Sequence, residues 1–154
     1  MNPNKALWEK GDFTRIADSM RESGEGLVQK LGLTKGMKVL DLGCGDGTTA
    51  LREAKLGADV LGVDIAANLV EAGNGRAKEA GLANCKFQEG DATDLRDLKD
   101  GAFDLVVSVF GAMFAPIPSD PPRRPDRDGE LDSERSDAGG PNPENQLRIF
   151  ASPA

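Results

Sequence analysis

The stretch Val39-Leu40-Asp41-Leu42-Gly43-Cys44-Gly45-Asp46-Gly47-Thr48-Thr49 decides the fold of this chain. It starts as a short apolar run, which is typical of a buried strand. Three glycines at alternate positions follow, and they allow a tight turn that can bring the backbone close to a ligand. The next residues can open a helix, so the stretch predicts a strand, an acidic ligand-facing turn and a helix.

Strands and helices alternate around this stretch. We predict strands over residues 37–42, 59–64, 84–88 and 102–110, and helices over 13–31, 47–56 and 66–80. The strands are almost continuously apolar, which favours a parallel sheet with helices on both faces. The predicted fold class is therefore α/β, a doubly wound and mostly parallel Rossmann-like sheet that is incomplete, with about four strands.

Composition divides the 154 residues into three parts. Residues 1–36 form a helical N-terminal segment, residues 37–115 form the sheet-bearing core, and residues 116–154 form a tail. Eight of the nine prolines lie at or after Pro116, and every lysine precedes residue 100. The tail has too few large apolar residues to offset its ordering entropy, so we predict disorder with at most a short turn near residues 147–150.

The net charge of −7 and the lack of a basic block argue against nucleic acid and anionic membrane surfaces as partners. No apolar run is long enough for a membrane span, and no secretory signal is visible. Cys44 and Cys85 lie far apart and fit reduced thiols, which predicts a cytoplasmic location. The chain has no histidine and no cysteine spacing suited to a metal, so we predict no metal site.

The carboxyl ends of the predicted strands carry the residues suited to a ligand. Asp64 follows Gly43 by about 20 residues, the spacing at which an acid accepts hydrogen bonds from ribose hydroxyls. Asp91 could accept from an adenine amino group while the Ala92 amide donates to a ring nitrogen. Either acid could instead be a helix N-cap. Their matching positions after successive strands favour a nucleoside site.

The glycine spacing separates two classes of nucleotide. Dinucleotide-binding domains use Gly-Xaa-Gly-Xaa-Xaa-Gly, whereas Thr48 stands here in place of the third glycine. Asp41 precedes the turn and Asp46 lies within it. Their charge would oppose a pyrophosphate and would suit a ligand that carries positive charge. S-adenosylmethionine has a sulfonium and an ammonium and no phosphate.

These residues resemble the class I S-adenosylmethionine-dependent methyltransferases. The matching segments run in order from Met37 to about Ala115: Val39 to Gly47, Leu61-Gly62-Val63-Asp64-Ile65, Glu89-Gly90-Asp91-Ala92 and Phe103-Asp104-Leu105-Val106-Val107-Ser108. Residues 8–13 and 110–116 resemble the small-molecule, ubiquinone-methylase-like branch. The resemblance implies S-adenosyl-L-methionine as cofactor and a small-molecule methyl acceptor.

The resemblance also assigns roles to single residues. Asp41, Gly43 and Gly45 would line the methionine part of the cofactor. Asp64 would bind the ribose with Ile65 packed on the adenine, Asp91 and Ala92 would bind the adenine edge, and Ser108 would border the methyl-transfer site. Trp8 and Phe13 would be a lid or an apolar anchor. No catalytic base is identified, and Asp12, Arg15 and Ser108 are candidates by expected location alone.

The chain departs from this family after Pro116. A complete family sheet has seven strands, and four are predicted here, which would leave the fourth as an exposed apolar edge. The tail composition is also typical of out-of-frame translation, so we expect a truncated or frameshifted member. Three functions stay open: methyl transfer, a non-catalytic or unstable fragment, and NAD-dependent oxidoreduction. The sequence does not predict the oligomeric state.

Overall fold

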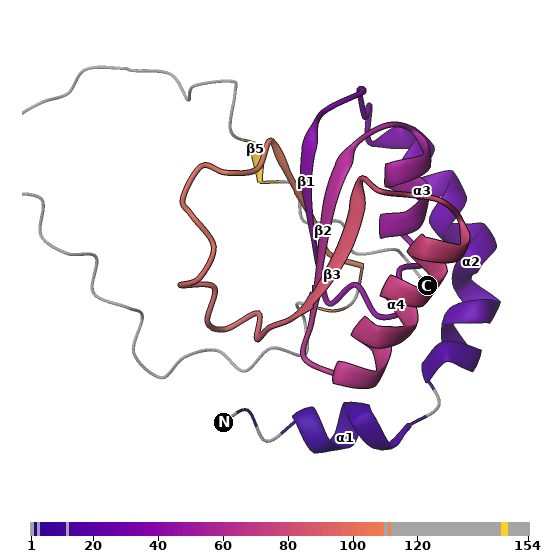
Figure 1. The fold of residues 1–154 in the computed structure, drawn as a ribbon, viewed down its shortest axis with the longest axis vertical. Coiled ribbons are helices and arrows are strands. Elements are labelled where there is room, and N and C mark those ends of the chain that lie inside the picture. Colours follow the sequence, from indigo (N-terminus) through magenta and orange to yellow (C-terminus); the bar gives the residue numbers. More distant parts are fainter. Residues whose placement is uncertain (1, 3, 12, 110, 112–145, 148–154) are drawn as a thin grey trace, which may run out of the picture.

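A computed structural model describes residues 2, 4–11, 13–109, 111 and 146–147 of this chain. Its centre is a parallel sheet with the strand order β3-β2-β1-β4-β5 (Figure 1). The strands are β1 (Lys38–Leu42), β2 (Asp59–Asp64), β3 (Cys85–Glu89), β4 (Leu105–Val107) and β5 (Gln146–Leu147). The short apolar runs of the sequence thus form the strands, as predicted.

The register brings the carboxyl ends of the strands to one edge of the sheet. Asp41 pairs with Val107 of β4, and Leu42 pairs with Val63 of β2. Beyond β1 the chain stays attached to β2, because the amides of Gly43 and Cys44 both donate to the Val63 carbonyl, at 2.8 and 3.2 Å. The glycine turn is therefore held against the end of the neighbouring strand.

Four helices complete the described fold: α1 (Lys5–Lys10), α2 (Phe13–Lys30), α3 (Ala50–Lys55) and α4 (Ala67–Glu79). In Figure 1, α2, α3 and α4 lie on one side of the sheet, and the segment between β3 and β4 passes on the other. Val28 of α2, Ala54 of α3 and Ala77 of α4 are buried in the core between these helices and the sheet. Helices on both faces were predicted, whereas the described helices cover one face.

Three elements differ from the sequence-based prediction. The helix expected over residues 47–56 begins at Ala50, because the preceding glycines hold positive φ angles in the turn. Helix α1 lies in the N-terminal segment that was predicted to be helical, but a separate helix over these residues was not predicted. Strand β5 pairs with β4 inside the segment predicted to be disordered, so the sheet has one short strand more than expected. The rest of that segment lies outside the described residues.

Among the described helices, none combines the length and apolar character needed to cross a bilayer.

Candidate functional site

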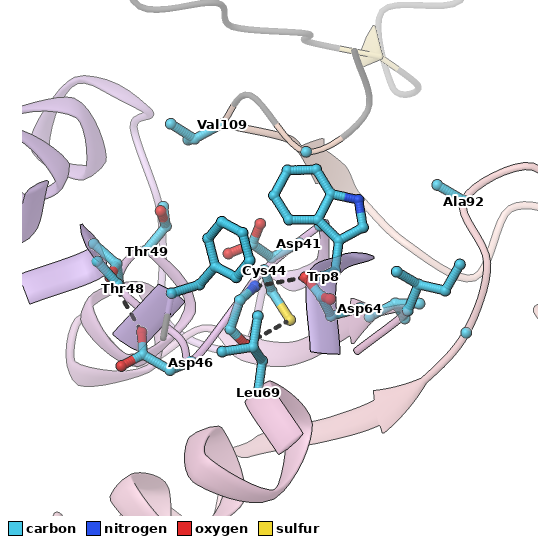
Figure 2. A pocket seen from close by; sticks show the side chains of 18 of the residues that line it. Trp8, Asp41, Cys44, Asp46, Thr48, Thr49, Asp64, Leu69, Ala92 and Val109 are labelled. Atoms are coloured by element: carbon cyan, nitrogen blue, oxygen red, sulfur yellow. Dashed lines mark hydrogen bonds between the residues drawn. The ribbon is translucent and has the colours of Figure 1, made fainter. Parts of the chain in front are cut away.

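A cavity of about 350 Å³ opens at the carboxyl edge of the sheet (Figure 2). This volume lies at the lower end of the range for small-molecule sites. Seven of the eight predicted site residues line it, namely Asp41, Gly43, Gly45, Asp64, Ile65, Asp91 and Ala92. The strand order thus brings together residues that are 50 positions apart in the chain.

Asp64 connects the glycine turn to the start of α4. Its Oδ2 accepts a hydrogen bond of 2.9 Å from the Gly45 amide, and its Oδ1 accepts one of 2.9 Å from the Ala66 amide. Ala66 is the N-cap residue of α4, and its own side chain forms no cap bond. Asp64 lies two positions before it and is therefore not the N-cap. Both of its oxygens instead fix backbone around the cavity.

Asp91 lies in the turn after β3. Its Oδ1 accepts from the amide of Thr93 at 2.9 Å and from the Thr93 hydroxyl at 2.8 Å. Burial raises the pKa of Asp91, but these bonds and one from the Asn2 side chain outweigh it, and the net pKa is lowered. No described helix starts here, so the N-cap alternative is wrong for this residue too.

Asp41 is one of two almost fully buried acids that line the cavity; it and Asp46 each have 2% of their surface exposed. Oδ2 of Asp41 has no hydrogen-bond partner among the described residues. Burial raises the pKa of Asp41 well above the usual range, and the nearby carboxylates of Glu53 and Asp64 act in the same direction. A bond from the Ala50 amide acts against them. An unpaired carboxylate oxygen in such a place is suited to a cationic group.

Asp46 does not present a free charge to a ligand. Its Oδ2 lies 3.0 Å from Nη2 of Arg21 and 2.9 Å from Nη1 of Arg76, and Arg76 also donates to the Asp46 carbonyl at 2.7 Å. These bonds tie the glycine turn to α2 and α4. The sequence-based interpretation that Asp46 repels a pyrophosphate therefore needs correction, because two arginines neutralise it.

The wall beyond β4 is formed by close backbone packing. A Cβ atom on Gly43 would lie 2.4 Å from Cα of Gly111, so only glycine fits at this crossing. Ser108 was predicted to border the methyl-transfer site. In the structure it is buried, and its hydroxyl donates a hydrogen bond of 2.7 Å to the Leu42 carbonyl. It is not among the described lining residues of the cavity. Val109 lines the cavity in its place.

The N-terminal helices supply a wall that the sequence indicated only in outline. Trp8 of α1 and Phe13 of α2 line the cavity, with ring centroids 4.8 Å apart and an angle of 51° between the rings. Ile16 and Leu27 of α2 extend this apolar wall. Asn2, at the start of the chain, completes it next to Asp91.

The other candidate residues have no direct place in the site. Asp12 lies outside the described residues. Arg15 is exposed and does not line the cavity. Cys44 lines it but is buried, and burial raises the pKa of its thiol well above the usual range, which makes it a poor nucleophile.

The cavity is acidic. The charged residues among its described lining are all aspartates, with neither lysine nor arginine. Within the part of the chain that the structure describes, no cluster of acidic or cysteine side chains could hold a metal ion. The arrangement suits a ligand that has an apolar body, hydroxyl and amino donors and positive charge, and it offers no described counter-ion to a phosphate.

Comparison with known proteins gives a consistent result. Residues 33–120, more than half of the chain, match the family model described as a methyltransferase domain. An uncharacterized protein of Mycobacterium tuberculosis is 37% identical over 114 residues, which cover 73% of this chain and 41% of that protein. A demethylmenaquinone methyltransferase of Staphylococcus aureus is 38% identical over 94 residues, which cover 58% of this chain and 37% of the enzyme.

Among solved structures, a magnesium protoporphyrin IX methyltransferase from Synechocystis with bound SAH (S-adenosylhomocysteine) aligns with a TM-score of 0.53 and 26% identity. The alignment covers 67% of this chain and 48% of that enzyme. The chain spans about two fifths of the length of the curated relatives that it matches.

Proposed function

Since the chain belongs to the methyltransferase-domain family, we propose that its cavity binds S-adenosyl-L-methionine and that it transfers the methyl group to a small-molecule acceptor. The family match confirms the resemblance found in the sequence. The observation that carries the proposal is the convergence of Asp41, Asp64 and Asp91 with a glycine turn in one cavity without a described basic side chain. A dinucleotide would bring its pyrophosphate next to acidic side chains there, and Thr48 stands in place of the third glycine of the dinucleotide pattern.

The residues present fit this cofactor. Gly45 has a positive φ of 55°, and a Cβ atom on it would meet nothing within 4 Å, so its bare backbone borders open space. The orphaned Oδ2 of Asp41 offers an acceptor to the ammonium group of the methionine part. Asp64 and Ile65 would hold the ribose and one face of the adenine, and Asp91 and Ala92 would hold the adenine edge.

The bound cofactor supplies an electrophilic methyl group on a positively charged sulfur. The chain's own contribution is to hold the cofactor in place and to keep water away, because such transfers depend chiefly on alignment and orientation. The hydrogen bonds from Gly45 and Ala66 to Asp64 keep the turn rigid. Trp8, Phe13 and Leu27 give the cavity an apolar wall, which would help to keep water away from the reacting groups.

A small-molecule acceptor is supported by the apolar wall and by the name of the relative from Staphylococcus aureus, a demethylmenaquinone methyltransferase. The acceptor would enter past Ile16, which lines the cavity and is 54% exposed. No described residue is positioned as a general base, so we expect acceptors whose nucleophile needs little activation.

Titration calorimetry with S-adenosylhomocysteine and NAD in parallel tests the cofactor. We expect binding of the first and none of the second. Binding of NAD alone, or of neither ligand, would contradict the proposal. A screen of phenols, quinols and amines with isotopically labelled S-adenosylmethionine then tests transfer. Cofactor binding without transfer to any acceptor would favour the alternative of a non-catalytic binding domain.

A further inference from the structure

Phe87 of β3 is a buried side chain that lies outside the described lining of the cavity. Its ring fills a space that three glycines leave open. A Cβ atom on Gly47, Gly62 or Gly73 would lie 2.5, 2.7 or 2.8 Å from the nearest ring atom. These glycines belong to the turn after β1, to β2 and to α4. One ring therefore contacts three separate parts of the fold.

The tip of this ring supports the glycine turn. The ring atoms nearest to a Cβ on Gly47 would be Cζ and Cε1, whereas those nearest to a Cβ on Gly73 would be Cδ1 and Cγ. Of the turn residues 43–49, all described in the structure, Gly47 alone does not line the cavity. The ring thus contacts the turn at the one residue that does not face the ligand space.

Asn74 of α4 fixes the backbone that carries the ring. Its Nδ2 donates to the Phe87 carbonyl at 2.9 Å, and its Oδ1 accepts from the Phe87 amide at 3.1 Å. Strand β3 is at the edge of the described sheet and lies beside α4 (Figure 1), so Asn74 pairs with backbone groups that an edge strand leaves open. The strand cannot slide along α4 without breaking both bonds.

The glycine turn needs a support because its backbone is unusually free. Gly43, Gly45 and Gly47 all have positive φ angles, and glycine loses more conformational freedom on ordering than any other residue. A turn that visits several conformations binds its ligand less tightly, in proportion to the fraction of time that it is competent to bind.

We propose that Phe87 is a positioning residue for the cofactor: its ring holds the glycine turn in the binding conformation, and Asn74 acts through it by fixing its backbone. This inference rests on the proposed function. It predicts that cofactor affinity depends on a side chain that does not line the cavity.

Leucine and methionine at position 87 separate the reach of the side chain from its volume. They exchange in protein cores at little cost, but methionine extends one atom further, to the level of the ring Cε1. We expect Phe87→Leu to weaken S-adenosylhomocysteine binding about tenfold, as for a turn that is competent roughly a tenth of the time. Phe87→Met should lose similar stability and stay within about threefold of the parent affinity. Calorimetry measures affinity, and urea unfolding measures stability.

Val60→Ala is the matched control for lost stability. Val60 is buried in the same core, near the amino end of β2, and is not among the described lining residues. Its replacement should destabilise the protein and leave the affinity unchanged. Unchanged binding by Phe87→Leu, or equal weakening by Phe87→Leu and Val60→Ala, would overturn the inference.

Asn74→Ala tests the route through the backbone of Phe87 and remains decisive if Phe87→Leu does not fold. It should weaken binding roughly threefold through the loss of its hydrogen bonds, and it should weaken Phe87→Met by less, because the two side chains act as one unit. Binding by Asn74→Ala as tight as that of the parent would overturn the inference. Failure of the parent protein to bind S-adenosylhomocysteine would instead overturn the proposed function itself.

Discussion

The Gly45 amide donates a hydrogen bond of 2.9 Å to Oδ2 of Asp64 and so joins the turn after β1 to the end of β2. Replacement of Asp64 by alanine leaves this donor and the Ala66 amide without their acceptor. We expect a loss of about 1–3 kcal/mol in the free energy of unfolding. We also expect at least tenfold weaker binding of S-adenosylhomocysteine, roughly the loss of one hydrogen bond to a charged group. Urea unfolding and calorimetry measure the two effects.

Asp59→Ala is the control for this substitution, because Asp59 lies at the opposite end of the same strand and is exposed. It should change neither quantity. Cofactor binding by Asp64→Ala as tight as that of the parent would contradict the assigned ribose role.

Asp46 is expected to matter for folding more than for charge recognition. Asp46→Asn leaves Arg21 and Arg76 facing each other without a shared carboxylate. Both arginines are partly exposed, so the expected cost is about 1–3 kcal/mol, less than for a fully buried pair. Thermal unfolding measures it. Glu25→Gln, which breaks the surface pair between Glu25 and Arg52, should stay close to the parent, and an equal loss in both variants would contradict this account.

The sequence could predict strands β1 to β4 and the acids at their ends because both depend on local pattern. An apolar run forms a parallel strand, and parallel strands bring their carboxyl ends to one edge. The pairing of Asp46 depends on arginines 25 residues before it and 30 residues after it, and no periodicity links them. The place of α1 could not be predicted either, since none of its residues is buried and it therefore has no core-facing stripe.

Two glycines of α4 also show that sequence pattern alone cannot reveal tertiary packing. Gly73 and Gly75 both weaken a helix, and the sequence does not distinguish them. In the structure, a Cβ atom on Gly73 would lie 2.8 Å from the Phe87 ring, whereas one on Gly75 would meet nothing within 4 Å. The difference arises because Phe87 of β3 packs against the face of α4 that carries Gly73, whereas Gly75 lies on a face that β3 does not contact.

These two positions therefore predict opposite effects of one substitution. Gly75→Ala should stabilise the protein by about 0.5–1 kcal/mol, because alanine favours the helix and adds no clash. Gly73→Ala should destabilise it by about 1–3 kcal/mol through overpacking against Phe87. Denaturant unfolding of the pair measures both. Changes of the same sign would contradict the packing seen around Phe87.

Glu53 of α3 is the largest fully buried side chain, and neither of its carboxylate oxygens has a hydrogen-bond partner among the described residues. Burial raises its pKa from 4.5 to about 7. The folded protein thus holds the proton more tightly than the unfolded chain does. The stabilising effect of this proton is complete below pH 4.5, declines as the pH rises toward 7, and is absent above it.

Glu53→Gln removes this dependence while keeping the shape of the side chain. The shift in pKa corresponds to about 3 kcal/mol, which is an upper estimate because the nearby Asp41 titrates together with Glu53. We expect the variant to be more stable than the parent at pH 8, by about 1–3 kcal/mol, and to gain much less at pH 5. Urea unfolding at the two pH values measures the difference. Glu71→Gln, on the exposed face of α4, should show no such difference. An equal gain at both pH values would mean that the Glu53 carboxyl does not titrate between them.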